Sequence, residues 1–189
     1  MNKAVFLDRD GVITQEPPHY AHRLDQLALI RESGNAIRLL NENDFRVVIV
    51  SNQSGIARGY YNEEDASLFN QALREKLTEM GANIDAIYIC PHHPQADIES
   101  YRMDCDCRKP KPGMLIKAAS DIGIDMKNSF MVGDKLIDIE AGQRAGVSTV
   151  LVKTGWGVEE LKKGNIKCDF ITEDLYQAAE HILDSKSNL

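Results

Sequence analysis

Short apolar runs recur along the chain, and segments with helical patterns separate them. The runs cover residues 4–7, 47–50, 84–89, 130–132, 149–152 and 170–171. Runs of this length are short, but they suffice for central strands of a parallel sheet. Strands that alternate with helices predict an α/β fold, a Rossmann-like three-layer sandwich with a mainly parallel central sheet.

Three of the intervening segments carry clear helix signals. The first opens at Asn62, a preferred N-cap residue, and acidic residues follow at the positive end of the helix dipole. The second follows Pro112-Gly113, and the third runs from about residue 136 to residue 145. Each ends at a glycine, namely Gly81, Gly123 and Gly146. The apolar stripe of the first helix consists of Phe69, Leu73, Leu77 and Met80.

Nothing in the pattern divides the chain, which has no internal repeat, low-complexity tract or linker. We therefore expect one domain over residues 1–189. One helix fills the interval between the first two strands, which leaves no room there for a large cap domain. Residues 91–112 have no periodicity, and such a long irregular stretch in a compact domain is usually functional or tied down.

Two aspartates, Asp8 and Asp10, directly follow the first apolar run, and Gly11 allows the chain to turn away. Open α/β folds bind their ligands at the carboxyl ends of the strands. Aspartate is rare in strands and is almost never buried without a partner. The pair therefore requires a cation, hydrogen-bond donors or a chemical role, although a plain Asp-Gly turn is a competing interpretation of so short a motif.

Other strand ends add polar groups at the same edge of the sheet. The second strand is followed by Ser51, Asn52, Gln53 and Ser54, whose hydroxyls, amides and backbone N–H groups suit a phosphate. The fourth is followed by Asp134 and Asp138, and the cations Arg108 and Lys109 precede it. Carboxylates for a hard cation beside positive charge for an anion are the groups that Mg²⁺-assisted phosphoryl transfer requires.

Three of the four cysteines lie close together and favour a metal site over a disulfide framework. Cys90 and His92 form one short pair, and Cys105 and Cys107 form another, with twelve residues between the pairs. Three thiolates and an imidazole can close a tetrahedral Zn²⁺ site with no open position, which indicates a structural zinc that holds the loop over about residues 90–110. The spacing alone does not separate His92 from His93 as the fourth ligand.

Composition and charge narrow the possible partners. The net charge of -7 argues against a nucleic-acid backbone as the principal partner, so we expect no nucleic-acid binding. The chain has no apolar run of membrane-spanning length and no charged and apolar leader, so we expect a cytoplasmic protein without membrane contact. A monomer is expected, because no exposed apolar stripe is evident.

The motifs resemble those of the haloacid dehalogenase (HAD) superfamily of phosphatases, in the right order over nearly the whole chain. The resemblance implies that Asp8 attacks phosphorus and that Asp10 protonates the leaving oxygen and then activates water. It implies Mg²⁺ bound by Asp8, the carbonyl of Asp10 and Asp134. It further implies that Ser51 and Lys109 bind the phosphoryl oxygens and that Asp138 orients Lys109. Val12 stands where many members have threonine.

The cysteine-rich loop narrows the resemblance to two families with a sugar bisphosphate or an amino alcohol phosphate as substrate. These are the heptose bisphosphate phosphatases of bacterial heptose-nucleotide synthesis and the histidinol-phosphate phosphatases of histidine synthesis. The chain is most similar to the first, and both families use Cys-x-His, which favours His92. The resemblance implies that Arg108 and Lys135 contact substrate and that the segment from Glu16 to His19 lines the sugar pocket.

Several alternatives stay open at this point. Glu16 could instead contact the amine of histidinol phosphate. The preferred anomer of a heptose bisphosphate is not defined by the sequence. A phosphoaspartate switch or a zinc-stabilised binding module are non-enzyme alternatives. Asp10 argues against the switch, because an acid or base so close to the nucleophile would promote hydrolysis of the phosphoaspartate. The binding module leaves the polar residues at the sheet edge without a role, namely Asp8, Asp10, Ser51, Asp134 and Asp138.

Overall fold

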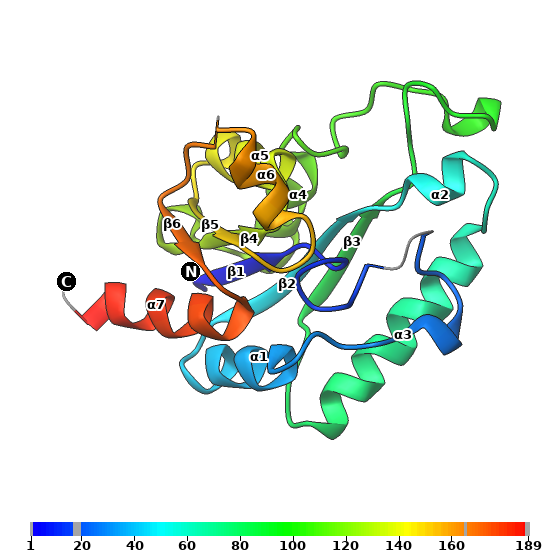
Figure 1. The fold of residues 1–189 in the computed structure, drawn as a ribbon. Helices are drawn as coiled ribbons and strands as arrows, with labels where there is room; N and C mark the ends of the chain where they lie inside the picture. The colour runs from blue at the N-terminus through cyan, green and yellow to red at the C-terminus, as the bar shows by residue number, and fades with distance from the viewer. Residues whose placement is uncertain (1, 17–19, 165, 188–189) are drawn as a thin grey trace.

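Six parallel strands form one sheet in the computed structural model of the protein, which describes residues 2–16, 20–164 and 166–187 (Figure 1). The strand order is β3-β2-β1-β4-β5-β6. The strands span β1 Ala4–Leu7, β2 Arg46–Asn52, β3 Ala86–Cys90, β4 Phe130–Gly133, β5 Ser148–Val152 and β6 Phe170–Thr172. The predicted fold class is confirmed.

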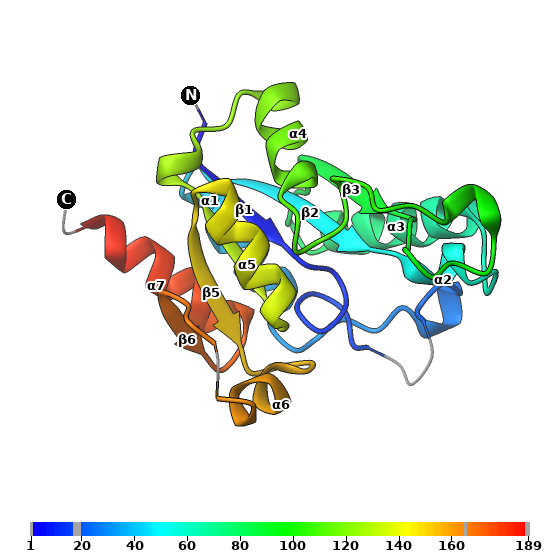
Figure 2. The same ribbon diagram turned by 90° about the horizontal axis from the view of Figure 1, so that it is seen from above.

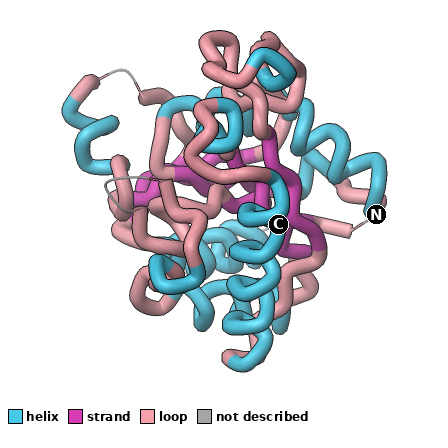
Figure 3. Tube along the Cα trace, turned by 90° about the vertical axis from the view of Figure 1, so that its right-hand side faces the viewer, coloured by secondary structure: helices cyan, strands magenta, loops and turns pink. Residues whose placement is uncertain are grey.

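Helices cover both faces of the sheet (Figures 1 and 2). One face packs against α1 (Ser33–Glu42), α3 (Glu63–Glu79) and α7 (Leu175–Ser187). The other packs against α4 (Gly113–Ile122) and α5 (Leu136–Ala145). Successive β1 side chains alternate between the two cores, with Val5 and Leu7 in the first and Ala4 and Phe6 in the second. Figure 3 shows the strands enclosed between these layers.

The shorter elements lie in the connections. Two brief α-helices follow strand ends, α2 (Ser54–Ala57) after β2 and α6 (Gly157–Lys162) after β5. Three 3₁₀ turns span Leu24–Gln26, Glu99–Tyr101 and Met126–Asn128. Within the described residues no insertion forms a cap domain, and no helix is long and apolar enough to cross a membrane.

The predicted helix boundaries hold closely. Asn62 caps α3 as expected, since its side chain accepts a hydrogen bond from the Asp65 backbone N–H at 2.9 Å. The predicted third helix matches α5 at both ends, and Gly146 is its left-handed C-cap. Met80, expected to face inward, is the C-cap residue and is 37% exposed, although its thioether end lies against Gly34 of α1.

Two strand boundaries differ from the prediction by two residues, and several others differ by one. The third strand begins at Ala86, not at Ile84, because the Asp85 carboxylate accepts the backbone N–H of Val47 at 2.8 Å, ahead of the first ladder pair. The second strand continues through Ser51 and Asn52, which pair with Ile89 and Cys90. The first two residues of the polar stretch 51–54 are therefore held in the sheet and do not lie in a turn.

Candidate active site

The site lies at the carboxyl ends of β1, β2 and β4. The strand order changes direction between β1 and β4, and such a switch point leaves a crevice for ligands in parallel sheets. An open cleft of about 1360 Å³ occupies this place. Asp8, Asp10, Ser51, Lys109 and Lys135 line it.

Lys109 holds two carboxylates together at the floor of the cleft. Its Nζ lies 3.0 Å from Asp8 Oδ1 and 2.6 Å from Asp138 Oδ1, and it donates to the Val50 carbonyl at 2.7 Å. All three charged side chains are buried. Burial alone would raise the pKa of the Asp8 carboxyl, but Lys109 and Lys135 outweigh it and keep that pKa below its usual value. Asp8 is therefore ionised, as a nucleophile requires.

Asp134 presents an unsatisfied oxygen beside Asp8. Its carboxylate is fully buried; Oδ2 accepts the Trp156 backbone N–H at 2.9 Å, and Oδ1 has no hydrogen-bond partner. Burial and the nearby carboxylates raise the pKa of Asp134 to about 8. A fixed cation would favour the ionised form, so this arrangement fits a hard divalent ion such as Mg²⁺. Oxygen ligands of Asp8, Asp134 and Asp138 lie within 4.8 Å of one another.

Two glycines make room for Asp134. Gly11 has φ +87° and Gly155 has φ +57°, and a Cβ at either position would overlap the Asp134 carboxylate. Both are in the left-handed region that favours glycine. The turn after Asp10 thus brings backbone, not side chain, against the carboxylates.

Asp10 lines the same cleft as Asp8, the predicted nucleophile, but its carboxylate makes a different set of contacts. Its Oδ1 accepts from Thr14 Oγ1 at 3.0 Å, its Oδ2 accepts from Gln53 Nε2 at 3.3 Å, and both oxygens accept from Arg9. Its side chain is 17% exposed and lines the cleft. Asp10 is therefore held firmly while one edge stays open to a ligand.

The predicted polar residues 51–54, at the end of β2 and the start of α2, contact different parts of the site. Gln53 Nε2 donates to Ser51 Oγ at 2.9 Å, and Tyr61 Oη donates to Gln53 Oε1 at 2.6 Å. Asn52 pairs with the backbone of Lys109 in both directions at 3.1 Å, which fixes the lysine to the end of β2. Ser54 Oγ accepts from Arg108 Nη1 at 3.3 Å.

The remaining predicted contacts lie at the rim of the cleft. Lys135 Nζ pairs with Glu16 at 3.1 Å and lies 3.7 Å from Asp134 Oδ2. Arg108 donates to the His92 carbonyl at 3.0 Å. His19 lies outside the described residues. Tyr20, Tyr60 and Trp156 also line the cleft and were not predicted, since isolated aromatic residues in loops carry no sequence signal for a site.

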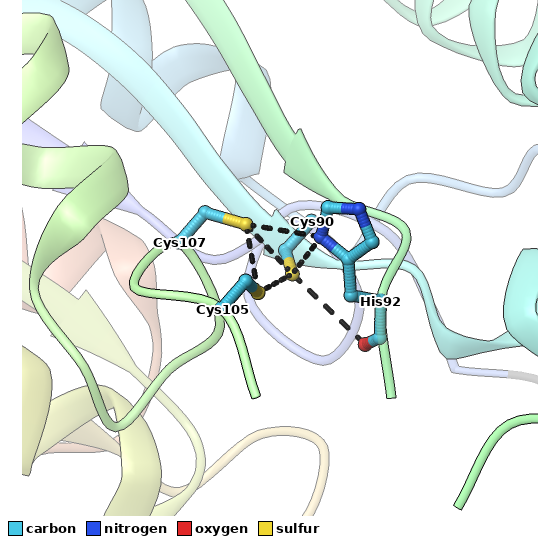
Figure 4. Close-up of side chains that lie close together, drawn as sticks. All are labelled: Cys90, His92, Cys105 and Cys107. Atoms are coloured by element: carbon cyan, nitrogen blue, oxygen red, sulfur yellow. Dashed lines mark hydrogen bonds between the residues drawn. The ribbon is translucent and has the colours of Figure 1, made fainter. Parts of the chain in front are cut away.

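The three predicted sulfur ligands and one imidazole converge, as Figure 4 shows. The Sγ atoms of Cys90, Cys105 and Cys107 lie 3.1 to 3.4 Å apart, and His92 Nδ1 lies 3.5 Å from Cys107 Sγ. His93 instead accepts the backbone N–H of Gln95 at 3.0 Å. The structure thus brings together His92, and not His93, with the thiols.

The chemistry of this cluster fits zinc. Burial raises the pKa of the Cys90 and Cys107 thiols, whereas hydrogen bonds from both overcome the effect of burial at Cys105 and lower its pKa. Three crowded thiols can therefore carry little negative charge unless a cation compensates it. A thiolate-rich tetrahedral set with one imidazole nitrogen is a typical structural zinc donor set.

The parallel sheet, with its paired aspartates at the switch point and a buried lysine between carboxylates, defines the HAD class of hydrolases. A HAD-hydrolase-like family model matches residues 106–178. A D-glycero-β-D-manno-heptose-1,7-bisphosphate 7-phosphatase of Pasteurella multocida is 43% identical, covering 100% of this chain and 95% of the relative. The Escherichia coli K12 protein of the same name is 41% identical, over 98% and 91%.

A solved structure gives the same result. The D,D-heptose 1,7-bisphosphate phosphatase from B. bronchiseptica, complexed with magnesium and phosphate, superposes with a TM-score of 0.87 at 35% identity, covering 97% of this chain and 99% of the other. The chain belongs to the heptose-1,7-bisphosphate 7-phosphatase family. The expected resemblance is confirmed, and the histidinol-phosphate alternative is not favoured.

Proposed function

We propose that the protein is a Mg²⁺-dependent phosphatase that removes the 7-phosphate of D-glycero-D-manno-heptose 1,7-bisphosphate. The observation that carries the proposal is the Asp8 carboxylate, buried at the floor of an open cleft, 3.0 Å from Lys109 Nζ and two residues before Asp10, which lines the same cleft. The names and identities of the relatives support the substrate. The reaction would serve bacterial heptose-nucleotide synthesis.

In the first half of the reaction, an Asp8 oxygen attacks phosphorus, and the bond from phosphorus to the sugar oxygen breaks. Asp10 gives its proton to that leaving oxygen, which yields a neutral hydroxyl. Lys109 Nζ and Ser51 Oγ stabilise the negative charge on the phosphoryl oxygens. They also hold the phosphoryl group so that the attacking and leaving oxygens are in line. Asp138, 2.6 Å from Lys109 Nζ, keeps the lysine charged and in place.

In the second half, Asp10 accepts a proton from water, which attacks phosphorus and releases phosphate from Asp8. Asp10 begins this step deprotonated, because it gave up its proton in the first half. The same residue therefore serves both directions of proton transfer. The Asp8 carboxylate is regenerated.

Asp8, the Asp10 carbonyl and Asp134 would hold Mg²⁺, which supplies charge neutralisation at the transferring phosphoryl group. The buried Asp134 oxygen without a partner supports this assignment. Arg108 and Lys135 would bind the phosphate that stays on the sugar, since a guanidinium can hold a phosphate through two N–H groups. Glu16, paired with Lys135 in this structure, would line the sugar pocket.

The test is phosphate release with Mg²⁺ from both anomers of heptose 1,7-bisphosphate, histidinol phosphate and common sugar monophosphates. We expect the β anomer to give the highest kcat/KM, by at least about tenfold over the others, which is about 1.4 kcal/mol of discrimination. The two curated relatives described above carry that anomer in their names. A preference for histidinol phosphate would overturn the substrate, and no turnover on any of them would overturn the enzyme class.

We further propose that Cys90, His92, Cys105 and Cys107 bind one structural Zn²⁺ per chain. The ion would fold the loop that places Arg108, because Cys107 precedes this arginine and the His92 carbonyl accepts its hydrogen bond. We expect metal analysis to find one zinc per chain. Removal of zinc by a strong chelator should lower the melting temperature by about 10 °C or more, since metal binding energy is folding energy.

Two cysteine variants test whether zinc binds at this cluster or at any cysteine of the chain. Cys105→Ser should lose most of the bound zinc and weaken substrate binding through Arg108. Cys168→Ser is the matched control, because Cys168 lies outside the cluster, and its zinc content should match that of the wild type. Equal zinc content in both variants, or a chelator without effect on stability, would contradict a structural zinc here.

A further inference from the structure

Arg9 is a buried arginine that the reaction described so far does not use. It lies between the two aspartates of the first motif, yet its side chain is only 1% exposed. Burying a guanidinium is costly unless hydrogen bonds and opposite charge compensate the lost hydration. The hydrogen-bond partners of Arg9 therefore indicate its role.

Arg9 holds the Asp10 carboxylate in a two-point fork. Its Nε donates to Asp10 Oδ1 at 3.0 Å, and its Nη2 donates to Asp10 Oδ2 at 2.9 Å. A fork of this kind fixes the plane of the carboxylate as well as its position. The rotation of the Asp10 side chain is thus set by the residue before it in the chain.

Helix α3 holds the guanidinium from behind. The guanidinium carbon lies 4.5 Å from the centre of the Phe69 ring, a cation–π contact. Its Nη1 donates to Asn70 Oδ1 at 3.0 Å, and its Nη2 donates to the Ala21 carbonyl at 3.0 Å. Phe69 and Asn70 are themselves buried. The arginine is therefore a fixed support and not a flexible ion-pair partner.

Gln53 links this support to the phosphate-binding side of the cleft. Its Oε1 accepts from Arg9 Nη2 at 3.1 Å, while its Nε2 donates to Ser51 Oγ at 2.9 Å. The orientation of Asp10 is thus connected to the hydroxyl assigned to the phosphoryl group. One rigid network sets the relative position of the proton donor and the reacting phosphate.

We propose that Arg9 is a positioning residue that fixes the Asp10 carboxyl for proton transfer to the leaving oxygen. This inference rests on the proposed function. When the bond from phosphorus to the sugar oxygen breaks and the bond to Asp8 forms, the Asp10 proton moves to the departing oxygen. Misplacing that donor by a fraction of an ångström weakens the transfer, because general acid catalysis depends on hydrogen-bond distance.

The fork requires arginine. A lysine would keep the charge, but a single ammonium cannot hold both carboxylate oxygens in one plane. Thr14 provides a matched comparison because it donates a single hydrogen bond to the same carboxylate, to Oδ1 at 3.0 Å. Arg9→Met removes the fork with an unbranched apolar chain that can still pack on Phe69. Arg9→Lys and Thr14→Val complete the set.

The experiment compares two leaving groups in each enzyme. Heptose 1,7-bisphosphate releases an alkyl oxygen that needs a proton, whereas p-nitrophenyl phosphate releases a stable anion that needs none. The ratio of the two kcat/KM values reports only the steps up to release of the first product, and any inactive fraction of enzyme cancels in it. We expect Arg9→Met to lower kcat/KM for the bisphosphate about 100-fold or more and for the nitrophenyl ester less than tenfold.

Further variants show whether the effect of Arg9→Met comes from loss of the two-point fork. Arg9→Lys should fall between Arg9→Met and the wild type, and Thr14→Val should change the ratio less than threefold. Equal losses on both substrates, or a Thr14→Val effect as large as that of Arg9→Met, would overturn the positioning role. Should neither Arg9 variant fold, Asn70→Ala carries the test, with a smaller fall of the ratio expected and an unchanged ratio counting against it. A wild-type enzyme inactive on both substrates would instead refute the proposed function.

Discussion

Replacing Asp8 by Asn is expected to lower kcat by at least about 10⁴-fold, to the limit of detection, in a phosphate-release assay. The amide has nearly the same shape but cannot form the phosphoaspartate. The variant loses one of the two ion pairs of Lys109, but Asp138 still pairs with that lysine at 2.6 Å, so the chain should stay folded. We therefore expect the melting temperature to fall by less than about 5 °C.

Asp121→Asn is the matched control for this variant. Asp121 is an aspartate of α4 that pairs with Lys117 and does not line the catalytic cleft, so its activity should equal that of the wild type. Retention of more than a tenth of wild-type turnover by Asp8→Asn would show that another group attacks phosphorus. A folded, inactive variant that still binds substrate would support the assignment of Asp8.

Lys109→Met is expected to reduce the free energy of unfolding by about 3 to 5 kcal/mol, as well as activity. Asp8 and Asp138 would then face each other in a buried environment with no cation between them. Burial alone would lower the pKa of Lys109, but the attraction and hydrogen bonds of Asp138 and Asp8 together outweigh it and raise that pKa, so the lysine is charged in the folded protein. Urea unfolding followed by circular dichroism measures the loss.

A second substitution tests this explanation. Adding Asp138→Asn to Lys109→Met should restore about 1 to 2 kcal/mol, because it removes one of the two uncompensated charges. Lys111→Met is the control. Lys111, two residues further on, pairs with Asp104, whose side chain is exposed, unlike those of Asp8 and Asp138. Its loss should change the free energy of unfolding by less than about 0.5 kcal/mol. Similar losses for Lys109→Met and Lys111→Met would mean that the buried pair contributes little.

The architecture could be predicted because strand and helix signals are local. Gly146 ends α5 at the residue expected, since a left-handed C-cap favours glycine. Helices α6 and α7 were not predicted. Helix α6 has only six residues, too few to show a period, whereas α7 buries Leu175, Ala178, Ala179 and Ile182 at helical spacing, a signal that the prediction did not use. The predicted start of β3 at Ile84 and the predicted end of β2 before Ser51 were wrong. A side-chain hydrogen bond of Asp85 bears on the first, and pairing of Ser51 and Asn52 with β3 decides the second; neither is visible in the sequence of a single strand.

The candidate site could be assembled from the sequence where residues follow strand ends. Asp8, Asp134 and Ser51 lie at one sheet edge because parallel strands share their direction. Arg9 and Asn70 were missed for a physical reason. A lone arginine in a turn is usually exposed, and an asparagine on a helix is usually solvated, so their burial against each other depends on how α3 crosses the sheet.

Cys107, Arg108 and Lys109 follow one another without a gap. The first belongs to the thiol and imidazole cluster, the second reaches the rim and the third enters the floor of the cleft. Inserting or deleting one residue in this tripeptide would turn at least one of the three side chains away from its place. A change of loop length on either side of this tripeptide therefore acts on the thiol cluster and on the two proposed phosphate-binding cations together.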